Sequence, residues 1–270
     1  MEPVHVTVWG DGVPAVLVHG STSWGADPEF GFAAQRPLAD DGFRLLAMDR
    51  RGHGAGPGTG SAQFASDYEL DAADIAGLLG DGAHLVGHSY GGVGAMLAAA
   101  RRPDAVLSLA LIEPGCYQAA ADHPAVAAAL RANRAAHAAL PRDLAPEAYL
   151  RAATESVGMP PLDPTPARLR AAGAALRERV CWEAPIPVAE LAAAPFPKLV
   201  LGGTWETAPA LYRERGGGPL RACAEVTADR IGARLVRIDG AAHYPHTERP
   251  DAVNEQLRTL WTTAARTPGH

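Results

Sequence analysis

The stretch AHLVGHSYGG, residues 83–92, decides the fold of this chain. It opens with a largely apolar run typical of a buried strand, and the helix-forming run Met96–Ala100 follows it. In a G-x-S-x-G turn between a strand and a helix, the serine occupies a strained conformation, and the flanking glycines let strand and helix approach each other. The sequence therefore predicts that Ser89 lies exposed at the carboxyl end of a strand, as a candidate nucleophile.

Similar β-rich runs recur along the chain, separated by helix-like stretches. They are Val4–Trp9, Ala15–His19, Arg44–Asp49, Ala83–His88, Val106–Glu113, Lys198–Gly202 and Arg234–Ile238. Several of these runs are almost continuously apolar, as strands covered on both faces should be. The alternation predicts an α/β fold with a mostly parallel sheet flanked by helices.

The strand pattern stops between Cys116 and Pro185, where the sequence becomes alanine-rich and helical. We interpret residues 116–185 as an inserted helical cap over the carboxyl edge of the sheet, and residues 1–115 and 186–270 as the core. A cap in this position would shape a substrate pocket. The glycine run at 216–218 is interpreted as a flexible linker.

Candidate partners for Ser89 lie at the ends of other predicted strands, where ligands of open α/β sheets bind. His243 follows the last strand, and small neighbours would let it approach Ser89 as the general base, with His246 as its competitor. The backbone N–H groups of Ser21 and Tyr90 are expected to form an oxyanion hole.

Four motifs occur in the order seen in a known superfamily. They are His19-Gly20, Asp49-Arg-Arg-Gly-His-Gly54, Gly87-His-Ser-Tyr-Gly91 and Gly240-Ala-Ala-His243. Together they span nearly the whole chain and resemble the signatures of the α/β-hydrolase superfamily. The resemblance implies Ser89 as nucleophile and His243 as base, with the loop from Asp49 to Gly54 mainly structural.

The third member of the expected triad departs from the commonest pattern of that superfamily. After the strand Lys198–Gly202, where many relatives place an aspartate, only Glu206 could serve. Glu113 instead ends the strand that follows the Ser89 turn, at a position that resembles relatives whose acid lies there. We favour Glu113, because a strand end is rigid and this strand should neighbour that of Ser89.

Two tryptophans and an arginine pair fall in loops near the expected site. Trp24 and Trp205 are candidate substrate-binding residues that could line an apolar pocket, although plain packing explains them equally well. The pair Arg50-Arg51 is expected to be solvated, as two-residue charge pairs usually are.

Composition narrows the range of partners. The net charge of −6 comes without any run of five or six like charges, which disfavours nucleic acid and membrane surfaces and favours a small, mostly neutral substrate. Three scattered cysteines suggest neither disulfides nor a zinc site, and no metal or organic cofactor is expected. Without a signal segment or a long apolar stretch, we expect a soluble, cytoplasmic protein, and the sequence leaves its oligomeric state open.

The motifs and the resemblance lead to one expected function and two alternatives. A Ser89, His243 and Glu113 triad would hydrolyse an ester, lactone or related carbonyl through an acyl-enzyme. The first alternative is a non-hydrolytic enzyme of the same fold, such as a cyclase, an acyltransferase or a C–C cleaving enzyme of secondary metabolism. The second alternative is a ligand-binding protein without catalytic activity.

Overall fold

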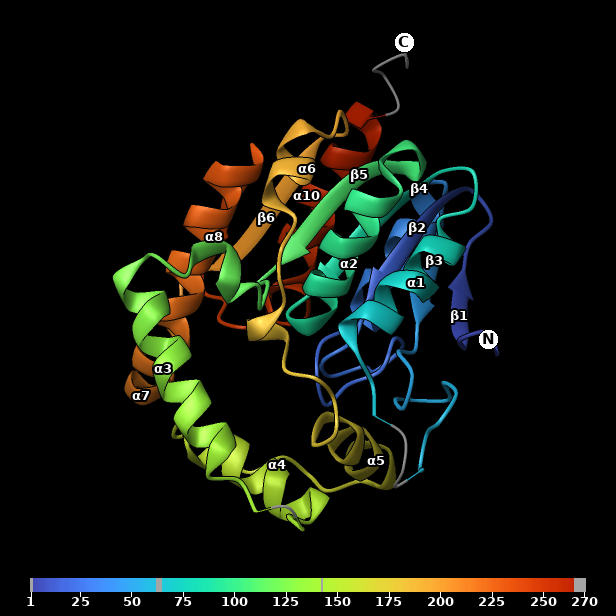
Figure 1. Ribbon diagram of the computed structural model, residues 1–270. Helices are drawn as coiled ribbons and strands as arrows, with labels where there is room; N and C mark the ends of the chain where they lie inside the picture. The colour runs from blue at the N-terminus through green and yellow to red at the C-terminus, as the bar shows by residue number, and fades with distance from the viewer. Residues whose placement is uncertain (1, 62–64, 142, 265–270) are drawn as a thin grey trace.

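The described residues form one seven-stranded sheet in the order β1-β3-β2-β4-β5-β6-β7, as Figure 1 shows for the computed structural model, which describes residues 2–61, 65–141 and 143–264. The strands are β1 (Val6–Trp9), β2 (Val13–Val18), β3 (Phe43–Met48), β4 (Ala83–His88), β5 (Val106–Ile112), β6 (Lys198–Gly203) and β7 (Arg234–Ile238). β1 pairs antiparallel with β3, and the other pairings are parallel. The predicted α/β fold with a mostly parallel sheet is confirmed.

The central strands are apolar on both faces because both faces are covered. On β4, Leu85 packs into the core cluster on one face, and its neighbour Val86 packs into the cluster on the other face. Successive side chains of a strand point to opposite faces, so an unbroken apolar run satisfies both cores at once.

Helices cover the two faces unequally. One core contains buried residues of α1 (Tyr68–Leu78), α2 (Tyr90–Arg101), α6 (Val188–Ala193) and α8 (Gly218–Ile231). The other core contains residues of the 3-10 helix η1 (Ala33–Asp41) and of α10 (Pro250–Ala264). The sheet is therefore sandwiched, and loops at its carboxyl edge are free to carry functional groups.

The segment between β5 and β6 leaves the sheet. It contains α3 (Pro124–Ala138), α4 (Pro146–Glu155) and α5 (Pro166–Ala175), which lie beyond the carboxyl ends of the strands in Figure 1. The buried positions of α3 are Val126 and Leu130, and α4 buries Leu150. This arrangement is what a cap requires, while the exact limits of the cap at residues 116 and 185 stay a prediction.

The glycine run at 216–218 is helical, so its interpretation as a flexible linker was wrong. A π-helical turn, Arg213–Gly217, follows α7 (Ala210–Tyr212) and leads directly into α8. A Cβ atom at Gly217 would lie 2.7 Å from Cδ2 of Trp205. Glycine is needed there because an indole packs against the backbone, and not because the chain must bend freely.

The short helix α9 (Pro245–Glu248) follows the His243 loop and precedes α10. Short 3-10 helices are η2 (Pro103–Ala105), η3 (Tyr117–Ala120) and η4 (Cys181–Glu183). Within the described part of the chain, no helix is both long and apolar enough to cross a membrane.

Candidate active site

Ser89 lies in a strained turn between β4 and α2. Its backbone has φ 50° and ψ −115°, a conformation that non-glycine residues rarely adopt. A Cβ atom at Gly91 would lie 2.4 Å from the His19 carbonyl oxygen, and one at Gly87 would lie 2.6 Å from the Gly92 Cα. Only glycines permit strand and helix to approach this closely, and the approach lifts Ser89 out of the sheet edge.

His243 faces the Ser89 hydroxyl. Its Nε2 lies 3.2 Å from the Ser89 Oγ, and it is carried by the loop between β7 and α9. The buried His88 supports this loop, because its Nε2 donates to the His243 carbonyl oxygen at 2.9 Å. Burial lowers the pKa of His88 well below its usual value, which keeps the ring neutral in this role.

Glu113 lies behind His243. Its Oε2 is 3.8 Å from the His243 Nδ1, and its side chain is fully buried. The other carboxylate oxygen, Oε1, accepts from the Gly203 N–H at 2.7 Å and from the Trp205 indole N–H at 3.2 Å. Glu206, the alternative acid, is exposed, and its carbonyl oxygen accepts from Arg213. The geometry therefore favours Glu113, and the catalytic roles themselves stay predictions.

The competing base, His246, is turned into the protein. It is fully buried, and its Nε2 donates to the Phe30 carbonyl oxygen at 3.3 Å. Burial lowers its pKa to about 3, so the ring stays neutral. This position leaves His243 as the histidine beside Ser89.

The two tryptophans have different surroundings. Trp205 has no exposed surface, so it cannot line a pocket, and the expectation of substrate contact was wrong for this residue. Its indole supports Glu113 instead, a role that its place in the loop after β6 did not reveal. Trp24 is partly exposed, and its ring lies 4.9 Å from the Arg168 guanidinium carbon, so its contact with substrate stays a prediction.

The expected oxyanion donors border Ser89. Tyr90 is the first residue of α2, so its N–H has no acceptor within the helix. A Cβ atom at Gly20 would lie 3.1 Å from the Ser89 Cβ, which places the Gly20–Ser21 backbone beside the nucleophile. Both residues thus lie beside Ser89, and the role of their N–H groups as oxyanion donors stays a prediction.

A cavity of about 300 Å³ lies between these donors and the cap. Ser21 and Tyr90 line it from the core, and the cap contributes Leu140, Tyr149, Leu176 and Trp182 among mainly apolar walls. Glu178 is also a lining residue, and its carboxylate is paired with Arg50. The cavity is large enough for a small, largely apolar molecule beside Ser21 and Tyr90.

Arg50 and Arg51 are buried, so their expected solvation was wrong. The Arg50 Nε donates to the Asp71 Oδ2 at 2.6 Å, and the Arg51 Nε donates to the Asp74 Oδ2 at 2.6 Å. Burial opposes the charge of Arg50, but its two carboxylate neighbours, Asp71 and Glu178, outweigh burial and raise its pKa. The sequence held one indication of this burial, because the arginine pair follows a run of residues typical of a buried strand.

Among the residues that the structure describes, no three His, Cys, Asp or Glu side chains cluster in a way that could hold a metal ion.

The fold agrees with the comparisons to known proteins. The sequence matches the alpha/beta hydrolase family over residues 15–256, which is most of its length. The chain therefore belongs to the α/β-hydrolase family.

Two curated relatives match shorter segments. A non-heme haloperoxidase of Rhodococcus erythropolis is 40% identical over 90 residues, covering 31% of this chain and 30% of the relative. An sn-1-specific diacylglycerol lipase of Mus musculus is 36% identical over 106 residues, covering 37% of this chain and 33% of the relative. The chain thus aligns with only about a third of the length of each.

Solved structures match over nearly the full length. A thermophilic esterase from Thermogutta terrifontis is 25% identical, with a TM-score of 0.64 over 97% of this chain and 93% of that one. An α/β hydrolase from Sphaerobacter thermophilus is 26% identical, with a TM-score of 0.63 over 96% of each chain.

Proposed function

We propose that the protein is a serine hydrolase that cleaves an ester, lactone or related carbonyl of a small, largely apolar substrate. The observation that carries the proposal is the 3.2 Å separation between the Ser89 Oγ and the His243 Nε2 at the strained turn after β4. A hydroxyl needs a base within this reach to become a nucleophile at neutral pH. The full-length likeness to an esterase from Thermogutta terrifontis supports the same class.

Acylation would begin with attack of the Ser89 Oγ on the substrate carbonyl carbon. His243 takes the hydroxyl proton as the bond forms, and the buried Glu113 stabilises the imidazolium that results. The Ser21 and Tyr90 N–H groups hold the oxyanion, each worth about 3 kcal/mol in the transition state. The tetrahedral intermediate collapses, the C–O bond to the alcohol breaks, and His243 returns the proton to the leaving oxygen.

Deacylation repeats these steps with water as the nucleophile. His243 takes a proton from water as its oxygen attacks the acyl carbon, and the Ser89 Oγ leaves with that proton. The products are an acid and the regenerated enzyme. The mechanism uses no metal or organic cofactor.

The cavity supports a short, uncharged acyl group. Its volume of about 300 Å³ is at the small end of ligand sites, and its walls are mainly apolar. Mainly apolar walls do not repay the cost of removing a charged substrate group from water.

Turnover of p-nitrophenyl esters from acetate to octanoate tests the proposal. We expect the wild type to hydrolyse the short esters best and Ser89→Ala to lose at least about 10⁴-fold in kcat. Ser156→Ala is a matched control, because this serine is exposed and its hydroxyl donates to the carbonyl oxygen of Ala153 in the cap. It should keep wild-type turnover.

The alternatives are separated by the same panel. An absence of turnover on every ester would contradict the proposed hydrolase and favour a non-hydrolytic enzyme or a ligand-binding protein. Equal turnover by Ser89→Ala and wild type would place the activity outside this site.

A further inference from the structure

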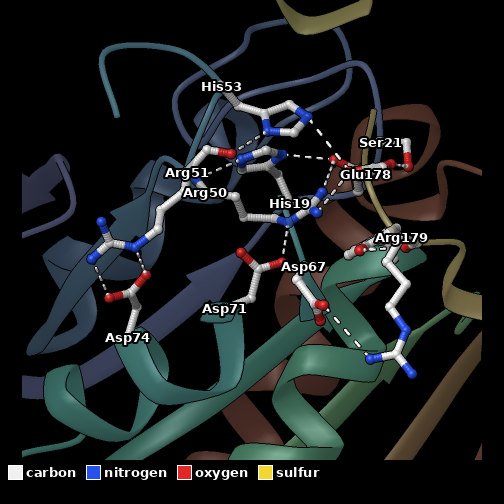
Figure 2. Close-up of polar contacts among 12 residues, drawn as sticks. His19, Ser21, Arg50, Arg51, His53, Asp67, Asp71, Asp74, Glu178 and Arg179 are labelled. Atoms are coloured by element: carbon white, nitrogen blue, oxygen red, sulfur yellow. Dashed lines mark hydrogen bonds and ion pairs between the residues drawn. The ribbon is translucent and has the colours of Figure 1, made fainter. Parts of the chain in front are cut away.

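Arg50, Asp71 and Glu178 form a buried charge cluster, here called the Arg50 cluster, which Figure 2 shows. It joins the core to the cap beside the expected oxyanion hole. Arg50 is at its centre and is fully buried. Its Nε donates to the Asp71 Oδ2 at 2.6 Å, and its Nη2 donates to the Glu178 Oε2 at 2.8 Å. Glu178 belongs to the cap segment that follows α5, and its side chain is only 6% exposed. A cap carboxylate thus reaches into the core.

The second oxygen of Glu178 contacts the loop that would supply an oxyanion donor. The Ser21 hydroxyl donates to the Glu178 Oε1, a contact drawn in Figure 2. One oxygen of the Glu178 carboxylate thus accepts from Ser21, and the other accepts from Arg50. A single cap residue therefore contacts both this loop and the buried arginine.

The peptide group between Gly20 and Ser21 is held from its carbonyl side. The Gly20 oxygen accepts from the Arg50 Nη1 at 3.3 Å and from the His19 Nδ1 at 2.7 Å. The His19 Nε2 accepts from the Arg50 backbone N–H at 3.0 Å, which fixes the proton on Nδ1. In a trans peptide the N–H points opposite to the carbonyl, so these contacts direct the Ser21 N–H away from Arg50.

Tyr90, the other expected donor, is held by the same elements. The Arg50 guanidinium carbon lies 3.8 Å from the centre of its ring, and its hydroxyl donates to the Arg179 carbonyl oxygen at 2.7 Å. Arg179 directly follows Glu178 in the cap. Both residues that are expected to donate to the oxyanion, Ser21 and Tyr90, are therefore in contact with the cap.

The loop also carries backbone strain that such contacts must hold. Thr22 has φ 56°, which is unfavourable for a β-branched residue. Its carbonyl oxygen accepts from the Nη1 of Arg168 on α5 at 2.8 Å. Strained segments persist only where their surroundings fix them, and here α5 and the segment after it supply two of the fixed points.

We propose that Glu178 is a positioning residue for the oxyanion hole, acting from the cap through the Ser21 hydroxyl and the Arg50 guanidinium. It fixes the direction of the Ser21 N–H, so the hole is complete only when the cap is docked. This inference rests on the proposed hydrolase function. Its effect belongs to the transition state, because an oxyanion forms only there.

Glu178→Gln tests the proposal, because it keeps the size of the side chain and removes the charge that holds Arg50. We expect kcat on a p-nitrophenyl ester to fall at least about tenfold, with KM within about twofold of wild type, since removal of a whole donor costs 10²–10³-fold. Glu178→Asp, which keeps the charge, should recover part of the loss.

Glu183→Gln is the matched control. Glu183 is also a cap carboxylate paired with an arginine, since its oxygens accept from the Arg134 Nε at 2.5 Å and Nη2 at 2.9 Å. It does not belong to the Arg50 cluster, so its removal should leave kcat within about twofold of wild type.

Ser21→Ala provides a second, independent variant if Glu178→Gln fails to fold. It keeps the backbone N–H and loses only the contact with Glu178, so it should also lower kcat. In the double variant the two losses should not add, because both break one connection. A kcat for both single variants within twofold of wild type, a loss confined to KM, or an equal loss in Glu183→Gln would overturn the role of Glu178. Inactivity of the wild type itself would instead contradict the proposed function.

Discussion

At the scale of single residues, the site depends on a few side chains whose neighbours restrict them strongly. Ser89 and Glu113 both have positive φ values, 50° and 43°, and both lie at the carboxyl ends of adjacent parallel strands. Backbone strain of about 1–3 kcal/mol per residue persists where packing leaves no alternative, and it is concentrated at functional sites. The register between β4 and β5 thus sets the distance between nucleophile and acid.

The assignment of the acid can be tested with two conservative variants. Glu113→Gln removes the charge behind His243 and should lower kcat by about 10⁴-fold, because the imidazolium loses its partner. Glu206→Gln changes an exposed side chain and should leave kcat within about twofold of wild type. Steady-state kinetics on one ester decides between them, and the reverse pattern would show that Glu206 is the acid.

At the scale of elements, α8 and the loop after β6 are joined through Trp205. The indole packs on Gly217, and its N–H donates to Glu113. The π-helical turn before α8 therefore supports the acid indirectly, although it lies about a hundred residues further along the chain.

Alanine substitutions at two adjacent glycines test this connection. At Gly217 a new Cβ would lie 2.7 Å from the buried Trp205 ring, so Gly217→Ala should cost about 1–3 kcal/mol of unfolding free energy. At Gly218 the nearest atom is 4.0 Å away, so Gly218→Ala should be neutral or stabilising by up to about 1 kcal/mol. Urea unfolding measures both, and equal stabilities would contradict the packing described for Trp205.

At the scale of the whole molecule, local sequence patterns could predict the sheet and the turn at Ser89. The strand Ala83–His88 and the turn at Ser89 depend on neighbouring residues, and the expected bounds of that strand are those observed. The fold class followed from the alternation of strand-like and helix-like runs, the family followed from the four motifs, and both were confirmed.

Long-range contacts set the limit of that prediction. Glu178 accepts a hydrogen bond from Arg50, which lies 128 positions away in the sequence. The residues next to either one do not indicate this pair. Trp205 was misplaced for the same reason, since its burial depends on a glycine in another helix. Charge pairs are usually solvated, and that general rule failed for Arg50 because the cap covers it.

The stability of the protein should fall steeply in acid. Burial lowers the pKa of His53 and His246 to about 3 and that of His84 to about 4, and it lowers the pKa of His19 and His88 well below the usual value. In the unfolded chain these groups take up protons below about pH 6.5, while the native rings stay neutral. Each therefore costs up to about 1.4 kcal/mol per pH unit as the pH falls from about 6.5 towards the native pKa of that group.

Asp71 opposes this trend. Burial, partly offset by Arg50, raises its pKa to about 6, so the native state holds its proton more tightly than the unfolded chain does. Its contribution grows as the pH falls, but it is one group against five. Urea midpoints should drop clearly between pH 7.5 and 5.5, and an unchanged midpoint would show that these histidines are not buried in neutral form.

The most direct test of the whole account is the covalent labelling of the protein by a fluorophosphonate, followed by peptide mapping with mass spectrometry. The reagent bonds to a serine only where a base and oxyanion donors activate the hydroxyl. We predict one adduct, on Ser89, with labelling at least about a hundredfold slower in His243→Ala. No adduct on Ser89, or an equal rate without His243, would contradict the claim that these two side chains form a catalytic pair.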